Sequence, residues 1–127
     1  IMDEKLNVAD PNDRVVHARN TMKREDVARL LIMDKGKLVG IISDNEIAFA
    51  LASVKRAFPI GKQKHQLDEL LIRDVMKTKV VWAKPSITIS DAAKIMMKFN
   101  VGSLPLIEGG IVKGIVTRTN LLKTVKS

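Results

Sequence analysis

The 127-residue sequence contains no cysteine and no tyrosine, and only one tryptophan, three phenylalanines and two histidines. Without cysteine, the chain can form no disulfide, no thiolate nucleophile and no zinc site built on sulfur. Proteins that bind single-stranded nucleic acids stack bases on several exposed rings, so the shortage of aromatics argues against that class. His17 and His65 lie 48 positions apart, which is too sparse for a His-rich metal site.

Long apolar runs and catalytic motifs are also missing. No stretch approaches the length needed to span a bilayer, and the polar, acidic start IMDEKLNVADP is unlike a signal peptide. A cytoplasmic protein is therefore expected. The sequence contains no P-loop, no GxSxG and no HExxH, and its adjacent acidic pairs would point apart on a helix. We expect no enzyme activity, no metal site and no required cofactor.

Positive charge is in excess, with 22 Lys and Arg against 14 Asp and Glu, giving a net charge of +8. Such an excess favours anionic partners. Lys55, Arg56, Lys62 and Lys64 form a basic cluster, but no helix-turn-helix or finger pattern accompanies it. A solvated linker is favoured there over a nucleic-acid contact.

The chain contains an internal repeat. Residues 2–51 align with residues 76–125 at a constant offset of 74 and without a gap. The identical pairs are Met2/Met76, Lys5/Lys79, Ala9/Ala83, Pro11/Pro85, Ala18/Ala92, Met22/Met96, Val27/Val101, Leu30/Leu104, Gly36/Gly110, Gly40/Gly114 and Ile41/Ile115. Ungapped register with the glycines and a proline in phase indicates a duplication.

The second copy carries the clearer structural signals. Residues 79–83 favour a β-strand that ends before Pro85, because the residue preceding a proline is pushed to extended geometry. Ser90 is the expected N-cap of a helix that Asn100 closes. Glycines 109 and 110 indicate a hairpin turn. The remaining expected elements are strands over 104–107 and 111–117 and a helix over 118–125.

The first copy repeats this order with weaker signals. A helix is predicted over 13–23, strands over 28–33 and 38–43, and a helix over 44–56. Pro59 and Gly61 are expected to prevent a helix in the linker, residues 58–64. An amphipathic helix over 66–75 would then lead into the second copy. The predicted division is a first repeat at 1–57, with its N-terminal edge short or trimmed, and a second at 65–127.

The predicted fold class is α/β (α+β), with two pseudo-symmetric β-α-β-β-α repeats. Each copy of about fifty residues would be a marginal core alone. We therefore expect the two sheets to pack against each other about a pseudo-twofold axis, creating two equivalent clefts.

The doubled pattern resembles the CBS (cystathionine β-synthase) domain, and the pair resembles a tandem CBS, or Bateman, module. The matching stretches cover essentially the whole chain: Arg73-Asp-Val-Met76 with Val80, Val81 and Pro85; Ile89-Ser-Asp-Ala-Ala93, Met96, Val101-Gly-Ser-Leu-Pro105 and Gly114-Ile-Val-Thr-Arg-Thr-Asn120; and in the first copy Val16-His-Ala18, Met22, Val27 and Gly40-Ile-Ile-Ser-Asp-Asn-Glu46.

The resemblance implies regulation rather than catalysis, through adenosine-containing ligands (AMP, ADP, ATP or S-adenosylmethionine) bound between the repeats. In that family a Ser or Thr ends the last strand and an Asp three residues later binds the ribose hydroxyls. The hydroxyl positions here are Ser43 and Thr117, but the Asp positions hold Glu46 and Asn120. Arg118 lies beside the second of these positions and would neutralise phosphate.

The family's pattern also implies the opposite wall of each cleft. For Ser43 and Glu46 it comprises Thr78, Val101, Gly102 and Ser103. For Thr117 and Asn120 it comprises Glu4, Val27, Ala28 and Arg29. The resemblance also implies a homodimer, with a possible further protein partner or fused domain. The departures at Glu46 and Asn120 leave open a module that binds no small molecule and works by dimerisation or docking. A nucleic-acid accessory role is the third alternative.

Overall fold

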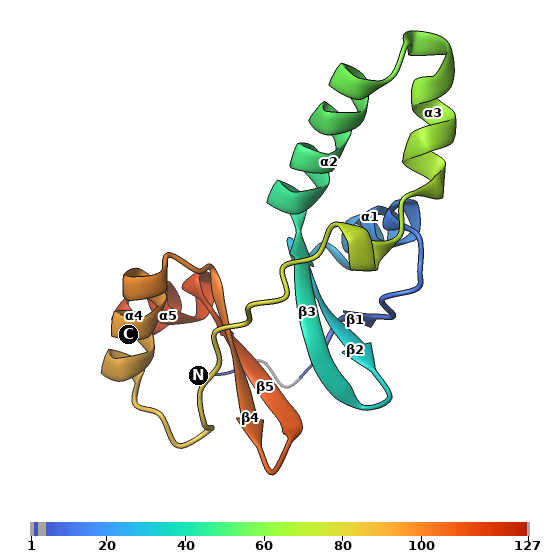
Figure 1. Ribbon diagram of the computed structural model, residues 1–127. Helices are drawn as coiled ribbons and strands as arrows, with labels where there is room; N and C mark the ends of the chain where they lie inside the picture. Colours follow the sequence, from blue (N-terminus) through green and yellow to red (C-terminus); the bar gives the residue numbers. More distant parts are fainter. Residues whose placement is uncertain (1, 3–4, 127) are drawn as a thin grey trace. The chain divides into compact units, whose positions relative to one another are not determined.

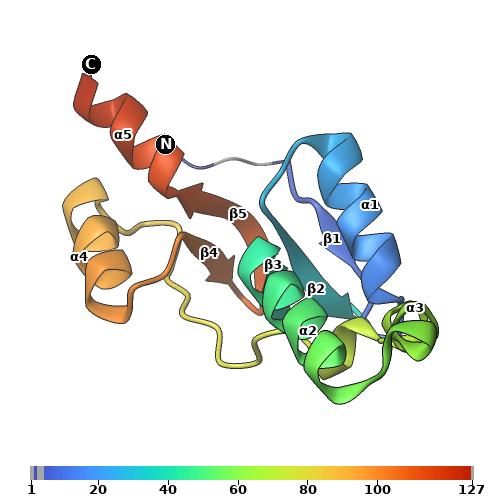
Figure 2. The same ribbon diagram turned by 90° about the horizontal axis from the view of Figure 1, so that it is seen from above.

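The computed structural model describes residue 2 and residues 5–126 (Figures 1 and 2). The chain divides into two compact units. One is Asn7–Val80, and the other comprises the described residues of 81–127 together with those of 1–6.

The Asn7–Val80 unit is built around a three-stranded sheet. Its elements are β1 (Val8–Ala9), α1 (Val15–Glu25), β2 (Arg29–Asp34), β3 (Lys37–Ser43), α2 (Asp44–Ala57), α3 (Ile60–Glu69) and a 3-10 turn, η1 (Ile72–Asp74). The central strand β2 pairs parallel with β1 and antiparallel with β3. The core comprises buried side chains from α1, β2, β3, α2 and η1: Val15, Ala18, Met22, Leu30, Ile32, Ile42, Ile47 and Ile72. Figure 1 shows α2 and α3 as a helical hairpin.

The second unit contains α4 (Ile89–Phe99), the hairpin β4 (Ser103–Glu108) and β5 (Ile111–Thr117), and α5 (Arg118–Lys126). Its core comprises Ala92, Met96, Leu104, Leu106 and Val116. The expected helix–strand–strand–helix order holds in both copies, with bounds within two residues of those predicted, and the expected first strand is present in the first copy as β1.

The backbone repeats with the 74-residue offset of the sequence. Ala9 pairs parallel with Ile32, and Ala83 forms a parallel bridge with Leu106. Both hairpins shift register at the equivalent place, after Ile32 and after Leu106. The left-handed residues also correspond, namely Asp26 with Asn100, Lys35 with Gly109, and Gly36 with Gly110. The duplication is therefore a duplication of structure as well as of sequence.

Two local predictions in the second copy are wrong. Residues 79–83 do not form a strand, since only Ala83 pairs with β4. The β-favouring composition of that run is overridden because its other residues find no neighbouring strand. The N-cap of α4 is Thr88, whose Oγ1 accepts from the Asp91 N–H at 3.1 Å, so the helix begins before the predicted cap, Ser90.

The segment joining the copies also differs from prediction. Pro59 does separate α2 from α3, but Gly61 lies inside α3, which occupies most of the expected linker. The predicted helix over 66–75 instead ends at Glu69 and gives way to η1. Proline fits this helix start because its missing N–H needs no partner there. The repeat boundaries themselves stay a prediction.

The segment that follows α3 belongs to the core of the first copy. Ile72 is fully buried there, and its N–H donates to the carbonyl of Asp13 at 2.8 Å. Met76 packs on the same core, whereas its repeat partner Met2 packs on the core of the second copy. Each core therefore includes a methionine from the segment that leads into the other copy.

Some large apolar side chains are exposed. Met22 and Met96 are buried in the two cores, but Met97, next to Met96, is 82% exposed. Trp82 is 51% exposed, so it is not a core anchor. None of the helices that the structure describes is long and apolar enough to cross a membrane.

Candidate functional site: the starts of α2 and α5

The first candidate site lies where β3 ends and α2 begins. Glu46 Oε1 accepts from the Ser43 backbone N–H at 2.8 Å and from the Ser43 hydroxyl at 2.7 Å. This is a capping box, in which residues three apart satisfy the free groups at a helix start. The Glu46 side chain is only 12% exposed. Ser43 and Glu46, the two positions that the family's pattern indicates, are therefore held together by hydrogen bonds.

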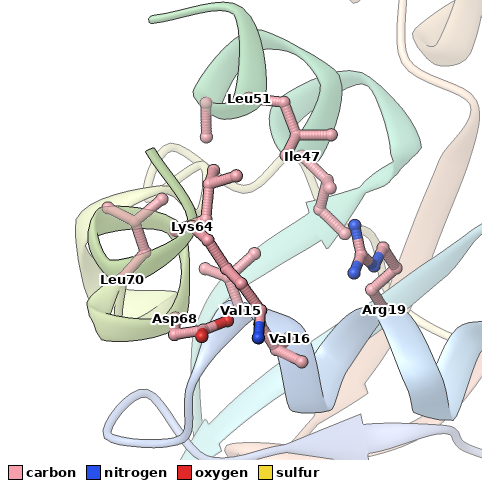
Figure 3. A pocket seen from close by; sticks show the side chains of 10 residues that line it. Val15, Val16, Arg19, Ile47, Leu51, Lys64, Asp68 and Leu70 are labelled. Atoms are coloured by element: carbon pink, nitrogen blue, oxygen red, sulfur yellow. The ribbon is translucent and has the colours of Figure 1, made fainter. Parts of the chain in front are cut away.

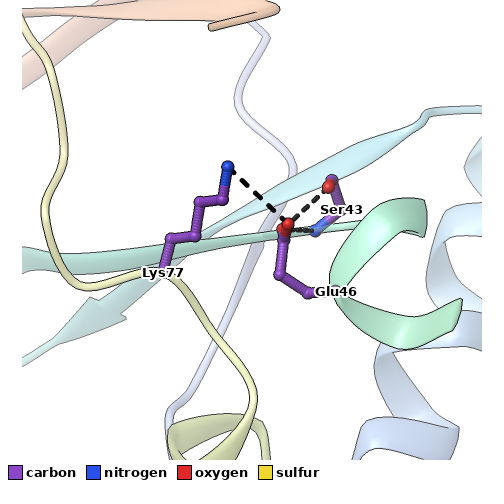
Figure 4. A network of polar contacts seen from close by, with 3 residues as sticks. All are labelled: Ser43, Glu46 and Lys77. Carbon is purple, nitrogen blue, oxygen red and sulfur yellow. Dashed lines mark hydrogen bonds and ion pairs between the residues drawn. The ribbon is translucent and has the colours of Figure 1, made fainter. Parts of the chain in front are cut away.

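Lys77 reaches the same carboxylate from the segment after η1. Its Nζ lies 3.9 Å from Glu46 Oε2. Figure 4 draws this ion pair beside the bonds from Ser43. Two backbone bonds hold this segment against β3: the Ile41 N–H donates to the Lys77 carbonyl at 3.0 Å, and the Lys77 N–H donates to the Ile41 carbonyl at 2.8 Å. The result is one cation beside one carboxylate at the start of a helix.

Gly40 permits this approach. A Cβ on Gly40 would lie 2.6 Å from Met76 Sδ and 2.8 Å from the Lys77 carbonyl oxygen. A side chain there would push the segment away from β3. Close packing against an extended segment is thus the reason for this glycine inside β3.

A hollow of about 560 Å³ adjoins Glu46 and Lys77 within the Asn7–Val80 unit. Its walls are mostly apolar, from Phe49, Val54, Leu70 and Val75. Phe49 is 71% exposed. A volume of this order lies within the range of small-molecule sites.

The start of α5 repeats the arrangement at the start of α2. Asn120 Oδ1 accepts from the Thr117 N–H at 2.8 Å and from the Thr117 hydroxyl at 3.0 Å. The Asn120 N–H donates back to Thr117 Oγ1 at 3.2 Å. Arg118 follows, exposed, with one guanidinium N–H donating to Asn100 Oδ1 at 3.5 Å.

The two starts differ in what they can offer a ligand. Glu46 keeps Oε2 as an acceptor after Oε1 is used, so it could still receive sugar hydroxyls. Asn120 uses its only acceptor oxygen on Thr117, which leaves two N–H donors. The Glu46 side chain can therefore accept hydrogen bonds from a ligand, whereas the Asn120 side chain can only donate them.

The other predicted site residues fall into two groups, one in each unit. The Ala28 carbonyl accepts from the Asp44 N–H, and Arg29 pairs with Ser43, so both lie at the start of α2. The Gly102 carbonyl accepts from the Arg118 N–H, and Ser103 pairs with Thr117, so both lie at the start of α5.

Three further predicted residues are less involved in these starts. Val27 and Val101 pack partly against the core of their own copy. Thr78 is exposed and follows Lys77. The predicted combination of Ser43 with residues 101–103, and of Thr117 with residues 27–29, joins the two units and stays a prediction. Glu4 lies outside the described residues.

The CBS domain family model matches residues 1–53 and 72–127, which include both helix starts. The chain belongs to the CBS domain family. Among the described residues, no group of three or more His, Asp or Glu side chains could hold a metal ion.

Several proteins resemble the whole chain. The uncharacterized protein MJ1426 of Methanocaldococcus jannaschii is 33% identical over 149 aligned residues, which cover 98% of this chain and 88% of that protein. The CBS domain pair of MJ0100, solved in complex with 5′-methylthioadenosine and S-adenosyl-L-methionine, has a TM-score of 0.82 at 26% identity, covering 99% of this chain and 92% of that chain. CBSX2, solved in complex with AMP, has a TM-score of 0.80 at 24% identity, with the same coverage.

Other relatives are much longer than this chain. The chain spans 31% of MJ1404 of the same Methanocaldococcus species and 20% of an inosine-5′-monophosphate dehydrogenase of Korarchaeum cryptofilum, at 25% and 30% identity.

Lys77 is the residue at the first CBS site that the sequence analysis missed. It directly precedes Thr78, which the family's pattern did indicate. The signal that could have found it is Gly40, because a glycine inside a strand marks a close approach by other backbone. What approaches Gly40 is the segment carrying Lys77.

Proposed function

We propose that the chain is a regulatory module that binds an adenosine-containing ligand at the starts of α2 and α5. The observation that carries the proposal is the paired arrangement of Ser43 with Glu46 and of Thr117 with Asn120, each at the end of a strand and the start of a helix. A related CBS domain pair is solved with 5′-methylthioadenosine and S-adenosyl-L-methionine, which supports this ligand class.

Glu46 is the residue proposed to bind the ribose. Its Oε2 faces Lys77 but is not used in the helix cap, so it can accept from both sugar hydroxyls, and charged acceptors make the stronger hydrogen bonds. Ser43 already donates its hydroxyl proton to Glu46, so binding a phosphate through Ser43 requires the hydroxyl to turn away. Lys77 supplies a positive charge close by, which favours ligands carrying phosphate. Thr78 and residues 101–103 are the proposed opposite wall.

We propose that the site at the start of α5 binds ribose more weakly than the site at the start of α2 and is better suited to bind phosphate. Asn120 has donors but no spare acceptor, and Arg118 adds a guanidinium at a helix N-terminus, where anions are favoured. Val27, Ala28 and Arg29 are the proposed wall on the other side. The two sites would therefore prefer different parts of a nucleotide.

The proposed mechanism is a shift in population. A ligand that binds one relative orientation of the two copies better than another will favour that orientation, and a partner or fused domain reads the change. No catalysis by this chain is proposed, and a cytoplasmic location stays a prediction.

Calorimetric titration with AMP, ATP and S-adenosylmethionine tests the proposal. We expect binding of at least one of them. Glu46→Gln should weaken it by about tenfold, because one charged hydrogen-bond acceptor contributes about 1.5 kcal/mol. Glu69→Gln, on the exposed end of α3, is the matched control and should bind like the parent. No heat and no thermal shift with any of the three at millimolar concentration would contradict the proposal.

A module that binds no nucleotide is the second candidate, because Asn120 uses its only acceptor oxygen, and Glu46 one of its two, within the helix caps. Its working surface would be the exposed apolar face of α4, where Met97 and Phe99 are 82% and 53% exposed. Light scattering would then give a homodimer that Met97→Lys converts to a monomer.

Asn120→Asp separates the two candidate functions. This substitution replaces the side-chain NH2 group of Asn120, which donates hydrogen bonds, with an oxygen that accepts them. Asp is also the residue that the CBS family has at this position. If nucleotide binding exists only in this variant and not in the parent chain, the interaction module is the correct function. If the parent chain binds, the variant should bind ribose more tightly at the second site.

A further inference from the structure

Three helices of the Asn7–Val80 unit surround a cavity of about 150 Å³, and none of the predicted ligand residues that the structure describes lines it (Figure 3). Its walls are apolar side chains from α1, α2 and the end of α3: Val15, Val16, Ile47, Leu51, Leu67 and Leu70. A cavity of about this volume with aliphatic and aromatic walls is large enough for a benzene-sized molecule.

The cavity arises from the way α3 covers its neighbours. α3 contacts both α1 and α2, yet none of its side chains is buried. Its first residue, Ile60, is 88% exposed, and of its apolar side chains Leu67 is the one that lines the cavity. Protein interiors are normally close-packed, so space beneath a helix is a place where another molecule gains contacts.

Charged side chains also line this cavity: Arg19 from α1, and Lys64 and Asp68 from α3. Figure 3 shows the side chains of Arg19, Lys64 and Asp68 beside the apolar ones. Within residues 2 and 5–126, the structure records no ion pair for any of the three. Two cations thus outnumber one carboxylate.

Few acidic side chains nearby offset these cations. Residues 47–67, which form most of α2 and α3, contain no acidic residue, and Asp68 is the acidic side chain that lines the cavity. We propose that this cavity is a second ligand site, distinct from the nucleotide sites, for a small organic acid with an apolar body. The apolar body fills the space under α3, and the carboxylate pairs with Arg19 and Lys64.

Phenylacetate is the probe, and its neutral analogue phenylacetamide is the comparator. A ligand of roughly ten non-hydrogen atoms binds with a dissociation constant on the order of 1 mM. Titration of the isotope-labelled chain should give saturable amide shifts in α1, α2 and α3. The amide analogue should bind at least about threefold more weakly, because it lacks the charge that the cations attract.

Variants locate the site. Arg19→Gln and Lys64→Gln should each weaken phenylacetate by about two- to fivefold. Lys23→Gln and Lys62→Gln remove the same charge from α1 and α3 outside the cavity and should leave binding unchanged. Val16→Phe should abolish the shifts by filling the space. If Val16→Phe does not fold, the exposed charge variants still decide the question.

Three outcomes would overturn the proposal. The first is the absence of saturable shifts at the lining residues up to about 10 mM phenylacetate. The second is equal affinity for the acid and the amide, which would mean a neutral apolar ligand. The third is shifts at these residues that depend on protein concentration without a probe, which would mean that a second copy of the chain occupies the cavity. None of these outcomes depends on nucleotide binding.

Discussion

Single residues determine how the first candidate site is assembled. Lys77 is far from Glu46 in sequence and reaches it because the backbone around Lys77 pairs with Ile41. That pairing requires the absence of a side chain at Gly40. Glu46 in turn is fixed by two hydrogen bonds from Ser43, so a substitution at Gly40 would disturb a polar group that it does not touch.

Gly40→Ala should destabilise the protein by about 1–3 kcal/mol, because the new Cβ overlaps the Lys77 carbonyl and the backbone must move. Gly61→Ala is the matched control. A Cβ at Gly61 meets nothing within 4 Å, and alanine favours a helix, so stability should be unchanged or rise by up to about 1 kcal/mol. Urea unfolding of both variants measures the difference. Equal effects would contradict the close approach at Gly40.

Among the elements, α4 shows how local capping decides where a helix begins. Both Thr88 and Ser90 are residue types that cap helices. Only Thr88 has extended backbone geometry there, and its Oγ1 accepts from the Asp91 N–H. Sequence alone does not separate these two candidates, because the choice depends on where the preceding chain leaves the strand bridge at Ala83.

Thr88→Ala should therefore cost about 1 kcal/mol of stability through the lost cap. Ser90→Ala should change stability by less than about 0.5 kcal/mol, since Ser90 is an exposed residue inside the helix. Thermal unfolding followed by circular dichroism compares the two. A larger loss of stability for Ser90→Ala than for Thr88→Ala would mean that Ser90 is the N-cap, as the sequence predicted.

For the whole molecule, the internal repeat predicted most of the fold. The hairpins and the helices α1, α2, α4 and α5 recur at the 74-residue offset, whereas the pairs Ser43/Glu46 and Thr117/Asn120 are indicated by the resemblance to the CBS family. The connecting segment could not be predicted in this way, because it has no counterpart in the first copy. Periodicity there indicated a helix leading into the second copy, whereas burial of Ile72 assigns the segment after α3 to the first.

Ile72→Ala tests that assignment. Ile72 is fully buried among residues of α1, β2 and β3, so truncation should cost about 2–5 kcal/mol. Ile60→Ala removes the same atoms from a side chain that is 88% exposed and should cost less than about 0.5 kcal/mol. Chemical unfolding measures both. A loss below about 1 kcal/mol at Ile72 would mean that this segment is not part of the first core.

The central claim is that an adenosine-containing ligand binds at the helix starts of this CBS pair. A crystal structure grown with AMP, ATP and S-adenosylmethionine together tests it most directly. We predict electron density for a ribose within hydrogen-bonding distance of Glu46 Oε2, with the rest of the ligand near Lys77 and Thr78. Well-ordered density for both helix starts, with no ligand at either, would contradict the claim.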